Sequence, residues 1–101
     1  MYRGTVHSRV IRKFKHGGLK RLYAKGDRSR VRSDQAGRIA LTLADLDSAG
    51  KPDDLNLPGY RLHRLKGRLK EYWSISISGN WRITFRFEEG DVYDVDLVDY
   101  H

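Results

Sequence analysis

Two short stretches carry most of the side chains that could do chemistry. The first is Leu62-His63-Arg64-Leu65-Lys66-Gly67, which places one imidazole among several cations, and the second is Asp99-Tyr100-His101 at the end of the sequence. An imidazole can act as base or acid near neutral pH. RNA cleavage uses such groups: a base takes the proton of a ribose 2′-hydroxyl, the oxygen attacks the adjacent phosphorus, and an acid protonates the leaving 5′-oxygen.

His63 and His101 fit either proton role in that reaction, and Lys66 and Arg82 can supply the positive charge that stabilises the phosphorane. Each residue also has a structural interpretation. His63 can be an ordinary surface residue of a strand, Tyr100 can pack on the core, and Asp99 can pair with an arginine. Arg82 and Arg86 can likewise pair with Asp94 and Asp96 on the next strand.

Other kinds of site are excluded or disfavoured by the residues present. The chain has no Cys, which excludes a disulfide, a thiolate zinc site and a cysteine nucleophile. Its four histidines form no i, i+4 pair, so we expect no metal site and no cofactor. A phosphate-binding glycine loop, a nucleophile elbow and a pair of catalytic carboxylates are also missing from the sequence.

Charge favours a polyanionic partner. The 101 residues include 20 Lys and Arg against 13 Asp and Glu, a net charge of +7. Residues 1–32 hold 11 basic residues against Asp27 alone, residues 61–86 hold seven against Glu71 alone, and residues 87–101 hold six acids and no Lys or Arg. Such segregation favours nucleic acid over a merely solvated basic surface. We expect the basic stripe of residues 61–86 to contact RNA phosphates.

The N-terminal half reads as a short strand and two helices. Residues 11–14 suit the strand, and residues 17–25 suit a helix that stops at Gly26. Residues 27–33 form a basic connection. Apolar residues recur at helical spacing over residues 34–49, with Ser33 or Asp34 able to cap the start and Gly50 the end. A loop follows over residues 51–60.

The C-terminal half has the alternation of strands. We expect a strand over residues 61–65, ending at Gly67, then strands over 72–78 and 81–88 joined by a Gly79-Asn80 turn. A last strand covers residues 92–98, with Tyr93, Val95 and Leu97 on one face. Trp73 and Trp81 are in register with apolar residues and belong to the core.

Helices grouped before hairpin-linked strands predict an α+β domain, with two N-terminal helices packed on one face of a mostly antiparallel sheet. The other face, with Arg82 and Arg86, is open to a ligand. We expect a single domain over residues 11–101 after an N-terminal extension over residues 1–10. A membrane span and a secretory signal are not recognisable, so we expect a cytoplasmic protein.

The motifs LH-x-LKG, NWRITF and DYH, in this order, make the chain similar to the HigB-type toxins of the RelE/ParE superfamily. The resemblance spans residues 11–101, including the IRKFKHGGLKRLYAKG start. It implies the microbial RNase-like fold and a metal-independent, ribosome-dependent mRNA endonuclease that inhibits translation. The implied partners are mRNA in the A site of the ribosome, on its small subunit, and a neutralising HigA-type helix-turn-helix antitoxin, through which alone the chain would reach operator DNA.

Position by position, the resemblance implies catalytic roles for His63, Asp99, Tyr100 and His101, and phosphate binding by Lys66 and Arg82. We expect further phosphate contacts from Arg64, Arg68 and Lys70 of the basic stripe. Arg64 stands where relatives often have Pro, and which histidine is base and which acid stays open. The alternatives are a ParE-like toxin that acts on gyrase without RNA chemistry, against which His63 and the DYH ending argue, and a basic binding module without toxicity.

Overall fold

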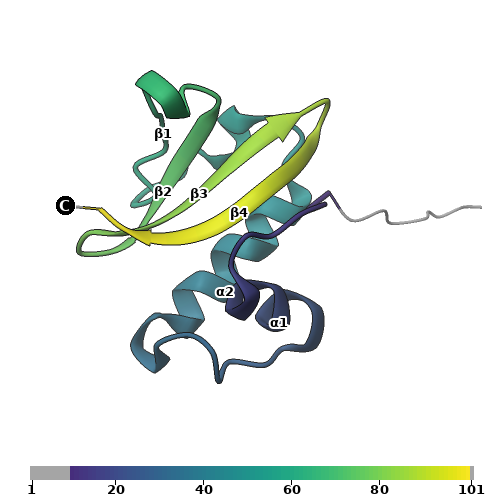
Figure 1. Ribbon diagram of the computed structural model, residues 1–101, viewed down its shortest axis with the longest axis vertical. Coiled ribbons are helices and arrows are strands. Elements are labelled where there is room, and N and C mark those ends of the chain that lie inside the picture. The colour runs from purple at the N-terminus through teal and green to yellow at the C-terminus, as the bar shows by residue number, and fades with distance from the viewer. Residues whose placement is uncertain (1–9, 101) are drawn as a thin grey trace, which may run out of the picture.

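Two helices precede a four-stranded antiparallel sheet in the computed structural model, which describes residues 10–100 (Figure 1). The helices are α1 (Gly17–Lys25) and α2 (Ser33–Ser48), and the strands, in sheet order, are β1 (His63–Arg64), β2 (Tyr72–Ser78), β3 (Trp81–Glu88) and β4 (Asp91–Asp99). Short 3-10 helices span Pro52–Leu55 and Gly67–Leu69. This arrangement confirms the expected α+β fold. No helix of the described part is long and apolar enough to cross a membrane.

The core lies between the helices and one face of the sheet. Ile39, Leu43 and Leu46 of α2 are buried together with Ile75 of β2 and Phe85 of β3. The two tryptophans, Trp73 and Trp81, pack against this cluster, as expected. Successive side chains of a strand point to opposite faces of the sheet. The strand residues that alternate with the core residues therefore lie on the opposite side of the sheet, which we call the open face.

The residues that cap the two helices agree only in part with those predicted from the sequence. Gly26 closes α1 in the left-handed conformation, with φ 69°, as predicted. The expected caps of α2 are wrong: its N-cap is Arg32, which makes no side-chain cap bond, and its C-cap is Ala49. Asp34 is not the cap because the helix already begins at Ser33, and its carboxylate accepts hydrogen bonds from Nε and Nη2 of Arg32, at 3.1 and 2.7 Å.

The segment before α1 runs alongside β4 and forms only isolated parallel bridges there, not the predicted strand over residues 11–14. Arg12 N donates to Val92 O at 2.7 Å, and Val95 N donates to Lys13 O at 3.1 Å. Val10, placed by the sequence in the extension, accepts from Val92 N at 2.7 Å.

A β-bulge in β4 is the main departure from simple alternation. Asp94 has φ 57°, and the β3–β4 register shifts between Thr84 and Arg86. The extra residue lets Val92 and Val95, three positions apart, both reach the core. Tyr93 instead pairs with Arg86 on the open face, so the prediction that it shares a face with Val95 is wrong.

The first strand is also shorter than predicted. Only His63 and Arg64 form β1, because Arg61 has φ 49° and the chain turns into a 3-10 helix after Lys66. Leu65 still donates its N–H to Tyr72 O at 2.9 Å, which fixes the end of β1 against β2.

Candidate active site on the open face

The pairing register arranges the open face in three rows across the strands. The middle row runs through His63, Ser74, Thr84 and Asp96. A second row, nearer the end of β4, runs through Ser76, Arg82 and Val98. The third row, nearer the start of β4, runs through Tyr72, Arg86 and Tyr93. Neighbouring rows are about 7 Å apart and neighbouring strands about 4.8 Å, so side chains from adjacent rows can contact one small ligand.

His63 presents an exposed imidazole in the middle row. Its Nδ1 lies 3.5 Å from Oγ of the buried Ser74 and 3.4 Å from Arg61 O. Among the described residues these contacts use Nδ1 alone, so Nε2 is the nitrogen that a ligand can approach. An exposed ring that is oriented through one nitrogen suits proton transfer through the other.

Arg82 lies in the row next to that of His63, and the ring of Tyr100 lies against its side chain. The Arg82 guanidinium carbon is 5.7 Å from the centroid of the Tyr100 ring. Nε and Nη1 of Arg82 are buried and form no hydrogen bond with the described residues. Buried donors of this kind are rare in folded proteins because leaving them unpaired is costly, and a guanidinium satisfies them best with a phosphate or a carboxylate.

The backbone holds the last described residues in place. Asp99 ends β4 opposite Trp81, and Tyr100 N donates to Asn80 O in the β2–β3 turn at 2.7 Å. Both side chains are exposed. The predicted site residue His101 lies outside the described residues and directly follows Tyr100 in the sequence.

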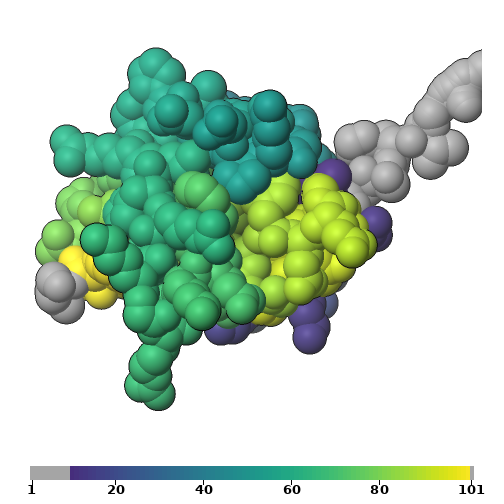
Figure 2. All heavy atoms as spheres, turned by 90° about the horizontal axis from the view of Figure 1, so that it is seen from above, coloured from purple at the N-terminus to yellow at the C-terminus, as the bar shows by residue number. Residues whose placement is uncertain are grey.

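Lys66 and Arg68 lie beyond the end of β1. With Leu69 they line a shallow hollow of about 580 Å³. The green segment around β1 and its following 3-10 helix protrudes from the surface (Figure 2). These two exposed cations are therefore accessible to a large polyanion.

Arg64 is not brought to the open face. It pairs with Trp73, so its side chain takes the other face of the sheet. Its Nε donates to Lys70 O at 2.8 Å, and its guanidinium lies 5.4 Å from the Trp73 ring centroid. The basic stripe of residues 61–86 is thus split between two faces, which the count of charges along the chain does not reveal.

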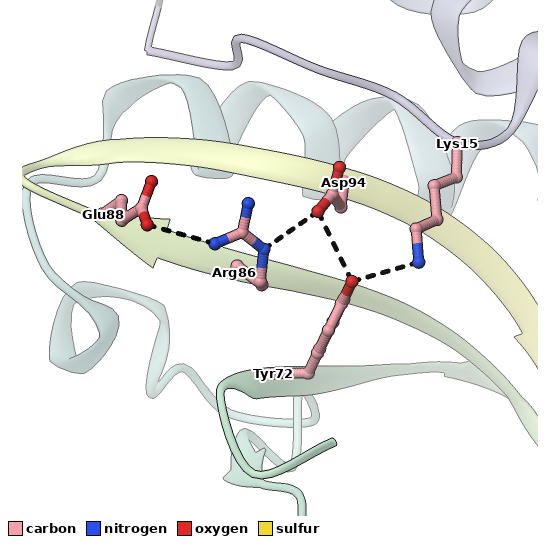
Figure 3. A network of polar contacts seen from close by, with 5 residues as sticks. All are labelled: Lys15, Tyr72, Arg86, Glu88 and Asp94. Carbon is pink, nitrogen blue, oxygen red and sulfur yellow. Dashed lines mark hydrogen bonds and ion pairs between the residues drawn. The ribbon is translucent and has the colours of Figure 1, made fainter. Parts of the chain in front are cut away.

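A polar network in the third row was missed by the sequence analysis. Lys15 Nζ donates to Tyr72 Oη at 3.0 Å, and Asp94 accepts from Tyr72 Oη at 3.4 Å and from Arg86 Nε at 2.9 Å (Figure 3). The Arg86–Asp94 pair confirms one structural alternative. Asp96 instead accepts from Leu97 N. Tyr72 alternates in phase with Ser74 and Ser76, which could have placed it here, but Lys15 comes from outside the sheet.

Electrostatics keep this network ionised. Burial raises the pKa of Asp94, but the hydrogen bond and charge of Arg86 outweigh it, so the pKa is lowered below 3.8. The hydrogen bond with Tyr72 raises the pKa of Lys15. Within residues 10–100, no three His, Asp or Glu side chains gather as a metal site requires.

Comparison with known proteins places these features in a family. Residues 12–101 match the family model described as the RelE-like toxin of the type II toxin-antitoxin system HigB. The chain is also 46% identical over 92 residues to Endoribonuclease HigB of Proteus vulgaris, and the alignment covers 91% of this chain and 100% of that protein.

Proposed function

Because the chain belongs to the HigB-like family of type II toxin-antitoxin toxins, we propose that it is an endoribonuclease that cleaves mRNA on the ribosome. The relative named Endoribonuclease HigB supports the reaction type. The open face supports it independently, because an accessible imidazole and a guanidinium whose Nε and Nη1 lack partners among the described residues lie there in adjacent rows. No observation on the described residues favours the gyrase-directed alternative.

The observation that carries this proposal is the state of Arg82. Its two buried nitrogens, Nε and Nη1, lack partners among the described residues, which costs about 1–3 kcal/mol for each unsatisfied donor. The scissile phosphate would supply the missing acceptors if the side chains that cover these two nitrogens move aside when RNA binds. Its negative charge grows as the phosphorane forms, so the guanidinium would bind the transition state more strongly than the ground state.

The proposed reaction needs only side chains. One of His63 and His101 takes the proton of the ribose 2′-hydroxyl as O2′ bonds to phosphorus. The P–O5′ bond breaks, and the other histidine protonates O5′, which leaves a 2′,3′-cyclic phosphate and a 5′-hydroxyl. Lys66 supports Arg82 in neutralising the phosphorane. Asp99 and Tyr100 complete the catalytic group, and Tyr100 also packs against the guanidinium.

The proposed partners follow from the family and from charge. A helix-turn-helix antitoxin of the HigA type would neutralise the toxin, and operator DNA would be reached only through that antitoxin. The ribosome, at the A site of its small subunit, would present mRNA to the open face in the cytoplasm. A net charge of +7 favours such an RNA-rich surface.

Purified toxin incubated with mRNA-programmed ribosomes tests the proposal. Primer extension on the mRNA is expected to show new ends in the A-site codon, and free mRNA is expected to be cut far more slowly. Absence of cleavage, together with inhibition of DNA supercoiling by gyrase, would move the chain to the other class of toxin.

A further inference from the structure

The third row of the open face contains a second group of side chains that the proposed chemistry does not use. Lys15, from the segment before α1, meets Tyr72 of β2, and both face the same side of the sheet as Arg86 of β3 (Figure 3). The Tyr72 hydroxyl lies between the Lys15 ammonium and the Asp94 carboxylate, at 3.0 and 3.4 Å. These two contacts fix the phenol ring before any ligand binds.

The register places this group next to the catalytic centre. Ser74 is the cross-strand partner of His63, and Tyr72 lies two residues from Ser74 on the same face. Tyr72 is therefore a diagonal neighbour of His63, about 7–8 Å away between Cα atoms. Arg82 lies in the row on the opposite side of His63. A strand of RNA that crosses from Arg82 over His63 meets Tyr72 next.

The two cations of this group differ in whether a carboxylate of the protein neutralises their charge. Arg86 pairs with Asp94 at 2.9 Å and with Glu88 at 3.3 Å, so its charge is neutralised within the protein. Lys15 is exposed, and no carboxylate of the described residues forms an ion pair with it. An ammonium has three N–H donors, and the bond to Tyr72 uses one of them. Lys15 is thus the cation of this row that can take a phosphate.

We propose that Tyr72 and Lys15 form a second RNA subsite, which holds a nucleotide next to the cleaved bond. The Tyr72 ring stacks on the base, and the Lys15 ammonium binds the adjoining phosphate. The combination of an aromatic ring with a cation is how single-stranded RNA is commonly held. This inference rests on the proposed function, since the same face must bind RNA.

Steady-state cleavage of mRNA on programmed ribosomes tests the subsite. Tyr72→Leu is expected to raise KM about 5- to 100-fold with little change in kcat, because stacking binds ground state and transition state alike. Tyr72→Phe keeps the ring and loses only the hydroxyl contacts, so it should restore most of the affinity. Lys15→Gln should raise KM and reduce its dependence on salt. Lys25→Gln, an exposed lysine of α1, is the matched control and should leave KM unchanged.

Thermal unfolding of the same variants separates binding from folding. If Tyr72→Leu and Lys15→Gln cut with the KM of the unsubstituted protein, the subsite is wrong while the endoribonuclease assignment stands. A KM that rises equally in Tyr72→Phe and Tyr72→Leu, with matching losses of Tm, would also overturn it, because the hydroxyl network would then act only on the fold. If the unsubstituted protein does not cut at all, the proposed function itself fails.

Discussion

The ring of Tyr100 lies over the guanidinium of Arg82, with 5.7 Å between the ring centroid and Cζ. The contact joins the last described residue to the start of β3. Tyr100 N, bonded to Asn80 O at 2.7 Å, holds the ring there. The terminus and the β2–β3 hairpin therefore form one unit, and Arg82 keeps its orientation without an ion pair among the described residues.

Removing Tyr100 and His101 together should abolish cleavage while the fold survives. Tyr100 is exposed, so the loss of buried area is small and Tm should fall by only a few degrees. Loss of a positioned acid or base lowers the rate about 10²- to 10⁴-fold. Primer extension and antitoxin co-purification measure the two properties. Near-normal cleavage by the shortened chain would contradict the role given to the terminus.

His63→Gln should separate chemistry from binding. The side chain is exposed, and glutamine keeps a polar group near Ser74, so Tm should stay within about 2 °C. We expect kcat to fall about 10²- to 10⁴-fold with KM nearly unchanged. Glu89→Gln, at an exposed position of the β3–β4 turn, serves as control. A kcat that drops less than tenfold in His63→Gln would remove His63 from the proton transfer.

The sequence predicts the elements of this fold better than the relations between them. The spacing of apolar residues predicts the exact bounds of α1 and the position of the turn in the β2–β3 hairpin, because both depend on local sequence. The bulge at Asp94 depends on the register with β3, and one inserted residue reverses the faces that alternation predicts. Tyr93 is misplaced for this reason.

The candidate site shows the same division. His63, Arg82 and Tyr100 can be named from their residue types and from family resemblance, but the unpaired N–H groups of Arg82 depend on what packs around it. Arg64 looks equivalent to its basic neighbours along the chain, yet its position in β1 turns it toward Trp73.

Acid should weaken the fold through Asp94. Its pKa is lowered below 3.8 in the folded protein, so its contribution is fully present above that value and is lost as pH falls through the folded pKa. Asp94→Asn should cost about 1–2 kcal/mol at pH 7, and this deficit should shrink below about pH 4. Chemical denaturation at several pH values measures it, with the exposed Asp53→Asn as control. A deficit that is constant with pH would contradict the prediction.

The basic residues in β1 and directly after it should have different roles, some in RNA binding and one in stability. Lys66 and Arg68 line the exposed hollow, so Lys66→Glu with Arg68→Glu should weaken ribosome association, make the remaining association less dependent on salt, and leave Tm nearly unchanged. Arg64→Glu removes a hydrogen bond to Lys70 O and a contact with Trp73, so it should lower Tm. Co-sedimentation and thermal unfolding compare them. Equal ribosome binding by the double variant and the unsubstituted protein would exclude the hollow as a phosphate site.

The reaction itself is tested most directly by removing the attacking group from the substrate. Programmed ribosomes would carry either an all-ribose mRNA or one with a single 2′-deoxynucleotide on the 5′ side of the mapped cut. Cleavage is expected in the first mRNA, with a 2′,3′-cyclic phosphate on the upstream product, and none is expected at that bond in the second. Cleavage of the 2′-deoxy bond at a similar rate would contradict attack by the 2′-hydroxyl and the roles assigned to His63 and Arg82.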